Sequence, residues 1–357
     1  MQTLETLYET IFKNNIFLDR KVSIENKKTL LLGPRKSGKS HLIIDHFLHY
    51  EKGTYLYIDF LDDRIDTVLV QENLESFLKK HPIKLLVIEH FDFSFELPHV
   101  EEIIITTTST CRAIDGFTRL FLYPLDFEEF ISFDKKHSNI EHLFNLFANH
   151  GTFPQIVQDI DSDHHRAMQE MLHLILLDTV TFSIYKRFCE LQSTKISLFQ
   201  IYNQLKTGMK LSKDKLYLIT SNLIDEKLLF LIEKYGQPNA PRKVFIIDFA
   251  LKNALTFKKD FLKRFENMVF LELAKREKEI FYDEFIDLYL PKENLAIFCI
   301  AFATDEMIQH KMKKILHTLK ALHVKKVQIV TLGNEETFSL ENIHFFVLPF
   351  WDWSLQL

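Results

Sequence analysis

Glycine, proline and cysteine are all scarce in this chain of 357 residues, which contains 8, 9 and 3 of them. So few glycines and prolines exclude a long flexible linker or a low-complexity segment. The three cysteines, Cys111, Cys189 and Cys299, lie far apart and form no CxxC pair. This spacing argues against both a disulfide framework and a zinc site.

Membrane and targeting signals are also missing. No run of about 18 apolar residues predicts a membrane span, and the polar, acidic start MQTLETLYET does not resemble a signal peptide. The net charge of −5 argues against a generally basic surface for nucleic acid, although it is compatible with a local basic face. We therefore expect a cytoplasmic protein with no membrane partner. Its length predicts two or three domains with ordinary cores.

The most informative motif is GPRKSGKS, which runs from Gly33 to Ser40 and has the form GxxxxGKS. The apolar run 29–32 before it is typical of a strand, and residues 41–48 after it have helical periodicity. A strand, this motif and a helix in that order are the signature of a phosphate-binding P-loop.

The residue types of the motif suit a triphosphate. Gly33 and Gly38 stand where a Cβ would hinder the close approach of backbone N–H groups to phosphate. We expect Lys39 to reach the β- and γ-phosphates and Ser40 to offer its hydroxyl to Mg²⁺, at the positive end of the following helix. The predicted ligands are therefore ATP and Mg²⁺. The residues expected to hold them in the loop are Gly33, Pro34, Arg35, Lys36, Ser37, Gly38, Lys39, Ser40 and His41.

Strands and helices alternate through the first third of the chain. Residues 54–60, 83–90 and 102–109 read as strands, the last two apolar on both faces, which predicts a parallel sheet covered by helices. Ligands sit at the carboxyl ends of such strands. Glu89 is therefore the candidate acid that holds Mg²⁺, and Thr106 or Thr108 the candidate group that senses the γ-phosphate or positions water. We assign the chemistry to Lys39, Glu89 and Thr106.

Further landmarks give the chain a family resemblance. Four landmarks follow one another along the chain: PLDFEEF at 124–130, a turn with Gly151 and Pro154, the helix ENMVFLEL at 266–273 and the closing PFWDW at 349–353. The sequence thus resembles a large prokaryotic family of AAA-type ATPases with a winged helix and a C-terminal domain. The resemblance implies an α/β P-loop domain at 1–138, a helical and winged-helix domain at 139–258 and a small, degenerate endonuclease-like α/β domain at 259–357.

The resemblance also shows where this chain departs from the family. Glu89 aligns with the family's metal-holding Asp, so His90 stands where the family has the Glu that activates water. Arg112 and Arg119 are the remaining candidates for a γ-phosphate contact. Nucleotide binding is consequently predicted more firmly than hydrolysis.

The later domains carry two further expectations. A long helical region leads into two runs expected to be helices, 211–219 and 223–232, and a β-wing at 243–248, which is the order of a winged helix. Four lysines beside it could meet DNA phosphates or simply be solvated: Lys206, Lys210, Lys213 and Lys215. In the C-terminal domain, Glu266 and Asp287 match two metal ligands of the endonuclease core. The third position falls in apolar residues 297–299 without a lysine, which argues against nuclease activity.

Three functions follow from these features. The first is an ATP-driven switch, a slow Mg²⁺-dependent ATPase that can associate with DNA. The second is a nucleotide-dependent protein-binding module that does not hydrolyse ATP, which the replacement by His90 favours. The third, a nuclease, is disfavoured. Each of the first two is compatible with an oligomer and with a protein partner.

Overall fold

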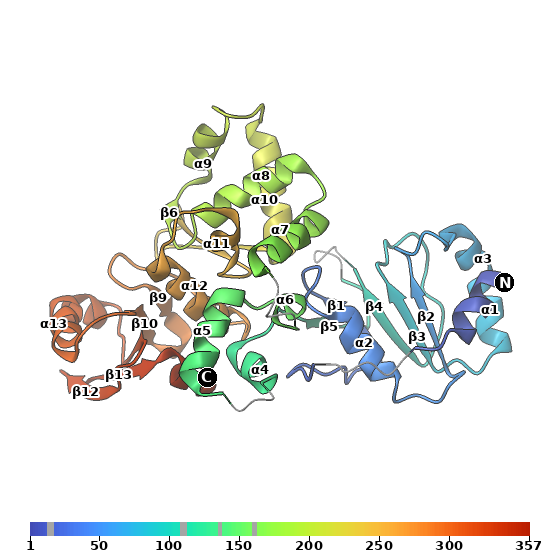
Figure 1. Cartoon of the computed structure of the whole chain (residues 1–357), viewed down its shortest axis with the longest axis horizontal. Helices are drawn as coiled ribbons and strands as arrows, with labels where there is room; N and C mark the ends of the chain where they lie inside the picture. The colour runs from blue at the N-terminus through green and yellow to red at the C-terminus, as the bar shows by residue number, and fades with distance from the viewer. Residues whose placement is uncertain (13–17, 108–112, 135–137, 159–162) are drawn as a thin grey trace. The chain divides into compact units, whose positions relative to one another are not determined.

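The computed structural model describes residues 1–12, 18–107, 113–134, 138–158 and 163–357. The chain folds into two compact units, Met1–Pro124 and Leu125–Leu357 (Figure 1). Each unit has its own sheet and core, and each is described by itself. Among the described helices, none is both long enough and apolar enough to cross a membrane.

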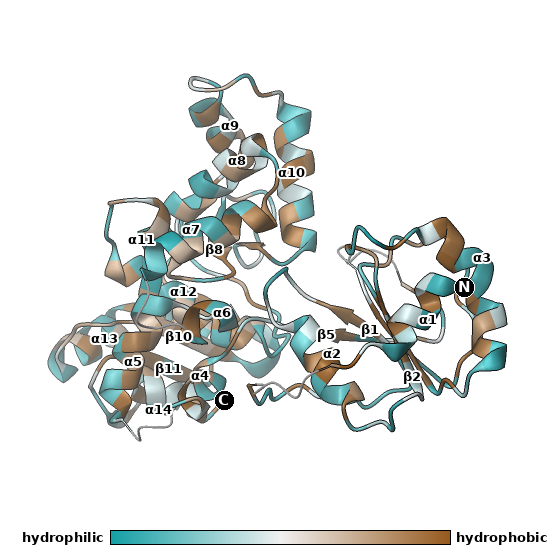
Figure 2. Ribbon diagram, turned by 45° about the vertical axis from the view of Figure 1, so that its right-hand side comes forward, coloured by the Kyte–Doolittle hydropathy of each residue, from teal (hydrophilic) through white to brown (hydrophobic). Residues whose placement is uncertain are grey.

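The first unit is built around a parallel sheet with strand order β2-β3-β4-β1-β5. Its elements are α1 (Gln2–Glu9), β1 (Lys28–Leu32), α2 (Lys39–Phe47), β2 (Tyr55–Asp59), α3 (Thr67–Lys80), β3 (Leu85–Glu89), β4 (Glu102–Thr106) and β5 (Thr118–Phe121). Because side chains alternate along a strand, each strand supplies apolar residues to both faces. Figure 2 shows the resulting hydrophobic character of β1.

Helices cover both faces of this sheet. Leu4 of α1 and Leu74 and Phe77 of α3 pack on one face, while Ile43 and Phe47 of α2 pack on the other. Every residue of β3 is buried because helices cover both faces of the sheet. The sheet therefore delivers the carboxyl ends of β1, β3 and β4 to the same edge, beside the start of α2.

The second unit begins with helices and a small antiparallel sheet of order β6-β8-β7. These elements are α4 (Phe127–Ser132), α5 (Ile140–His150), α6 (Pro154–Gln158), α7 (His164–Ile175), α8 (Thr179–Glu190), β6 (Lys195–Ile196), α9 (Leu198–Leu205), α10 (Lys213–Asp225), β7 (Leu229–Ile232), β8 (Arg242–Ile246) and α11 (Leu251–Leu255).

A mixed sheet of order β12-β13-β11-β10-β9 completes the second unit. Its elements are α12 (Phe261–Ala274), β9 (Leu288–Leu290), the 3-10 helix η1 (Pro291–Glu293), β10 (Leu295–Cys299), α13 (Asp305–Ala321), β11 (Lys326–Thr331), β12 (Glu336–Leu340), β13 (Ile343–Pro349) and α14 (Phe350–Leu355). Ile308, Met312 and Leu319 of α13 pack on one face of this sheet. Trp353 of α14 is buried, and its indole N–H donates to Gln328 Oε1 at 3.0 Å.

These observations confirm the predicted fold class: a parallel α/β sheet as in P-loop NTPases, a helical region, and a separate mixed sheet. The domain boundaries 1–138, 139–258 and 259–357 remain predictions; the two compact units divide after Pro124. The reason lies in α4, where Phe127 packs edge-on against Phe147 of α5 and Phe350 of α14. Residues 125–132 thus join the second unit.

One expected helix is wrong. The run 223–232 is divided between the end of α10 and the strand β7, which pairs with β8. Lys227 has a φ of 58°, and this left-handed conformation ends the helix and turns the chain into the strand.

Candidate nucleotide-binding site

The loop from Gly33 to Ser40 joins β1 to α2 with the backbone geometry that its glycines permit. Gly33 has a φ of 141°, and a Cβ there would lie 2.2 Å from the carbonyl oxygen of Leu122. Gly38 is the N-cap of α2 with a φ of 99°. Any other residue would strain the backbone at both positions and, at Gly33, would also collide with the segment that follows β5. The backbone of the loop itself therefore requires glycine at both positions, and the expected approach of phosphate stays a prediction.

The side chains of the loop differ in their contacts and burial. Lys39 Nζ donates to the carbonyl oxygens of Gly33 and Pro34 at 2.9 and 2.8 Å. Ser37 is buried, and its hydroxyl has no hydrogen-bond partner among the described residues. Lys36 and His41 are exposed, whereas Pro34 is buried and Arg35 is half-buried.

An arginine outside the motif holds the loop, and sequence reasoning missed it. The guanidinium of Arg20 donates to the carbonyl oxygen of Ser37 at 2.9 Å and to that of Tyr123 at 2.6 Å. It thereby ties the phosphate loop to the end of the first unit. No sequence signal marks this role, because Arg20 lies 17 residues before Ser37 and 103 before Tyr123.

Ser40 and Glu89 come together as the sequence predicts. The hydroxyl of Ser40 donates to Glu89 Oε2 at 2.8 Å. Glu89 is only 1% exposed, and its other carboxylate oxygen, Oε1, has no hydrogen-bond partner among the described residues. Burial raises the pKa of Glu89, while the bond from Ser40 acts in the opposite direction. A buried carboxylate with an unused oxygen next to a serine hydroxyl is a suitable environment for a divalent cation.

Asp59 and His90 extend this acidic site. β2 and β3 pair in register with Asp59 opposite Glu89, so both carboxylates leave the sheet at the same edge. His90 follows Glu89 with a left-handed φ of 56°, and its Nδ1 lies 2.7 Å from Asp59 Oδ1. Burial acts to raise the pKa of Asp59, but hydrogen bonds from His90 and the Leu61 amide lower it overall. Asp59 was absent from the sequence-based candidates, since its only signal is its place at a strand end.

Thr106 lies next to this turn. Its hydroxyl accepts a hydrogen bond from the His90 amide at 3.0 Å, and its carbonyl oxygen accepts one from the Phe91 amide at 2.9 Å. The side chain is buried. Thr106 therefore supports the backbone that carries Glu89 and His90, and its hydroxyl keeps a proton to donate. The other candidates Thr108 and Arg112 fall outside the described residues.

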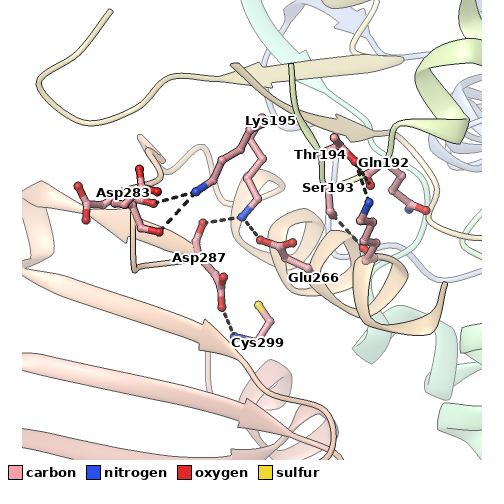
Figure 3. Close-up of polar contacts among 11 residues, drawn as sticks. Gln192, Ser193, Thr194, Lys195, Glu266, Asp283, Asp287 and Cys299 are labelled. Carbon is pink, nitrogen blue, oxygen red and sulfur yellow. Dashed lines mark hydrogen bonds and ion pairs between the residues drawn. The ribbon is translucent and has the colours of Figure 1, made fainter. Parts of the chain in front are cut away.

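The carboxylates expected in the endonuclease-like domain have a different neighbour. Figure 3 shows Glu266 of α12 and Asp287, just before β9, with their dashed contacts, while Lys195 of β6 points to the main chain of Asp283. The ammonium of Lys243, from β8, is ion-paired with Glu266 and lies 3.3 Å from the main-chain oxygen of Asp287. Asp287 Oδ2 accepts a hydrogen bond from the amide of Cys299 at 2.9 Å. A lysine ammonium thus neutralises the carboxylate that the sequence suggested as a metal ligand.

The first unit, with its phosphate loop between the first strand and the following helix, has the fold of a P-loop NTPase. No family model matches the chain. Its sequence is 24% identical over 422 aligned residues to the uncharacterized protein MJ1544 of Methanocaldococcus jannaschii, covering 98% of this chain and 95% of that protein.

Solved structures similar to this chain include a Walker-type ATPase and a DNA-bound ORC1 protein. The Walker-type ATPase PABY2304 of Pyrococcus abyssi has 15% identity and a TM-score of 0.39, over 64% of this chain and 90% of its own. The ORC1 protein of Aeropyrum pernix, in complex with DNA, has 13% identity and a TM-score of 0.32, over 65% of this chain and 87% of its own.

Proposed function

We infer that this chain binds Mg-ATP at the Gly33–Ser40 loop and works as a nucleotide-driven switch with slow, Mg²⁺-dependent ATP hydrolysis. The contact that carries this proposal is the 2.8 Å hydrogen bond from Ser40 to the buried Glu89. It places a hydroxyl and a carboxylate at the N-terminus of α2, where backbone N–H groups favour phosphate. Mg²⁺ bound there would neutralise charge on the β- and γ-phosphates.

On binding Mg-ATP, the side chains of the site would exchange their present partners for phosphate oxygens or Mg²⁺. The Lys39 ammonium would leave the carbonyl oxygens of Gly33 and Pro34 for phosphate oxygens, which are stronger acceptors because they are charged. Ser40 would turn its hydroxyl oxygen toward Mg²⁺, and Glu89 would hold the ion directly or through water. Thr106 would donate its hydroxyl proton to water or phosphate near the same strand ends.

The proposed switching would act through Arg20. It bonds to both the loop carbonyl of Ser37 and the carbonyl of Tyr123, two residues before the second unit begins at Leu125. A loop that closes on phosphate would move the Ser37 carbonyl, and this movement would change the hydrogen bond from Arg20 to the Tyr123 carbonyl. Nucleotide state can in this way bias the segment that leads into the second unit.

A second candidate function is a nucleotide-dependent binding module without turnover. The observation that favours it is the Asp59–His90 pair, because the residue after Glu89 is an imidazole already bonded to a carboxylate. In this proposal ATP stabilises one conformation and a protein partner recognises it. Single-turnover kinetics distinguish the two functions.

The second unit provides a candidate DNA contact. Lys213, at the start of α10, lies over the Phe199 ring at 4.7 Å, and Lys206 lies over the Tyr202 ring at 5.4 Å. Basic side chains beside aromatic rings on α9 and α10 could bind DNA backbone and bases. This role depends on the winged-helix arrangement that the sequence resemblance suggests.

The test measures binding of a fluorescent ATP analogue and release of phosphate from Mg-ATP. Lys39→Ala should abolish both, whereas Lys52→Ala, at an exposed lysine of the same unit outside the loop, should retain both. Phosphate release that depends on Lys39 supports the switch, and stimulation by duplex DNA supports the DNA contact. Binding without phosphate release supports the non-hydrolysing module, and the absence of binding refutes both.

A further inference from the structure

Three side chains at neighbouring strand ends form a compact group with mixed ligand chemistry. Asp59, Glu89 and His90 each offer one ligand atom, and these atoms lie within 4.8 Å of one another. The group arises because β2 and β3 run parallel and in register, so that Asp59 and Glu89 end side by side and His90 follows directly. Two carboxylates and an imidazole can surround a single ion.

Glu89 provides an independent sign that the group has room for a ligand. Its carboxylate is almost completely buried, and the Tyr57 hydroxyl interacts with it, but no group among the described residues makes a well-formed hydrogen bond to Oε1. A buried acceptor without a partner is costly, and a coordinated cation removes that cost. Glu89 Oε2 already accepts the proton of Ser40, so Oε1 is the oxygen left for an ion.

We propose that Asp59, Glu89 and His90 bind a divalent transition-metal ion, of the Mn²⁺ class, beside the phosphate loop and before nucleotide arrives. Imidazole nitrogen suits first-row transition ions, whereas Mg²⁺ prefers oxygen ligands and retains its water. The inference rests on the proposed nucleotide site for its biological role, since the ion would then also meet the phosphates. Ion binding itself is measured without nucleotide.

The experiment titrates the full-length chain with Mn²⁺ in the absence of nucleotide and follows free Mn²⁺ by electron paramagnetic resonance. We expect one ion per chain, displaced by Mg²⁺ only at concentrations at least about tenfold higher. Electron spin-echo modulation should show a ¹⁴N coupling from an imidazole nitrogen. His90→Gln should remove this coupling and weaken Mn²⁺ binding by about tenfold or more.

Two further variants make the result specific. Asp59→Asn should also weaken Mn²⁺ binding, while His99→Gln, at an exposed histidine of the same unit, should leave it unchanged. Circular dichroism of each variant checks that it is folded. The inference is overturned by the absence of Mn²⁺ binding, by binding without ¹⁴N coupling, or by equal affinity in His90→Gln and wild type.

Nucleotide binding is measured separately with the fluorescent ATP analogue and Mg²⁺. If nucleotide binds but Mn²⁺ alone does not, the ion site fails and the proposed function stands. If Mn²⁺ binds with the expected coupling but nucleotide does not bind, the proposed function fails and the ion site stands.

Discussion

The buried ion pair between Lys243 and Glu266 should make the second unit sensitive to the loss of either single partner. Their side chains are only 5% and 12% exposed, so water cannot replace either partner. Removing one charge from a buried pair typically costs about 3–5 kcal/mol, because the other is left without a partner. We therefore expect Lys243→Met to lower the free energy of unfolding by that amount.

The loss should depend on pH in a defined direction. Burial raises the pKa of Glu266 to about 7 even with Lys243 beside it. Between pH 4.5, the ordinary pKa of this carboxyl group, and about pH 7, the folded chain holds a proton that the unfolded chain releases. The contribution of Glu266 to stability therefore falls as pH rises through this range. Without Lys243 the pKa rises further. The destabilisation by Lys243→Met should thus be larger at about pH 8.5 than at about pH 6.

Urea unfolding followed by tryptophan fluorescence measures this effect in the correct part of the chain. Both tryptophans, Trp351 and Trp353, are in α14 of the second unit. Lys243→Met combined with Glu266→Leu should recover most of the loss, since an apolar pair of similar volume leaves no buried charge. The control is Lys278→Met, which removes a half-exposed pair and should cost at most about 1 kcal/mol.

Two results would refute this reasoning. One is a Lys243→Met variant within about 1 kcal/mol of wild type at both pH values, which would mean that the pair is solvated. The other is strict additivity of Lys243→Met and Glu266→Leu, because two side chains in contact are expected to couple.

Three other predictions concern single positions. Gly33→Ala should destabilise the first unit by about 2 kcal/mol or more, measured by thermal unfolding, and abolish nucleotide binding. Gly116→Ala, also at positive φ but with open space around its Cβ, should lower the stability less. Arg20→Ala should weaken binding of the ATP analogue several-fold by releasing the Ser37 carbonyl; unchanged affinity would contradict the proposed hold on the loop. Burial raises the pKa of Glu272 to about 7, so the wild type should lose up to about 3 kcal/mol of stability as pH rises from 4.5 to about 7. Glu272→Gln cannot titrate and should not show this loss; parallel stability–pH curves for variant and wild type would contradict the prediction.

The sequence alone determined the elements whose signals are local. The glycine spacing at Gly33 and Gly38, the apolar strand before the loop and the periodic helix after it all lie within about 20 residues. Strand ends such as Glu89 and Thr106 could be recognised because an apolar run stops there. These patterns specify backbone conformation and one-sided or two-sided burial, and so predicted the parallel sheet and the phosphate loop.

Only the tertiary structure decided which distant residues meet. Asp59 stands beside Glu89 because β2 pairs with β3 in parallel register. The residue pattern of either strand does not specify which strand it pairs with or in which register. Arg20 reaches the loop across the fold, and Lys243 meets Glu266 because β8 packs beside α12. Such contacts depend on long-range packing and register, whereas propensity and periodicity act over a few neighbouring residues.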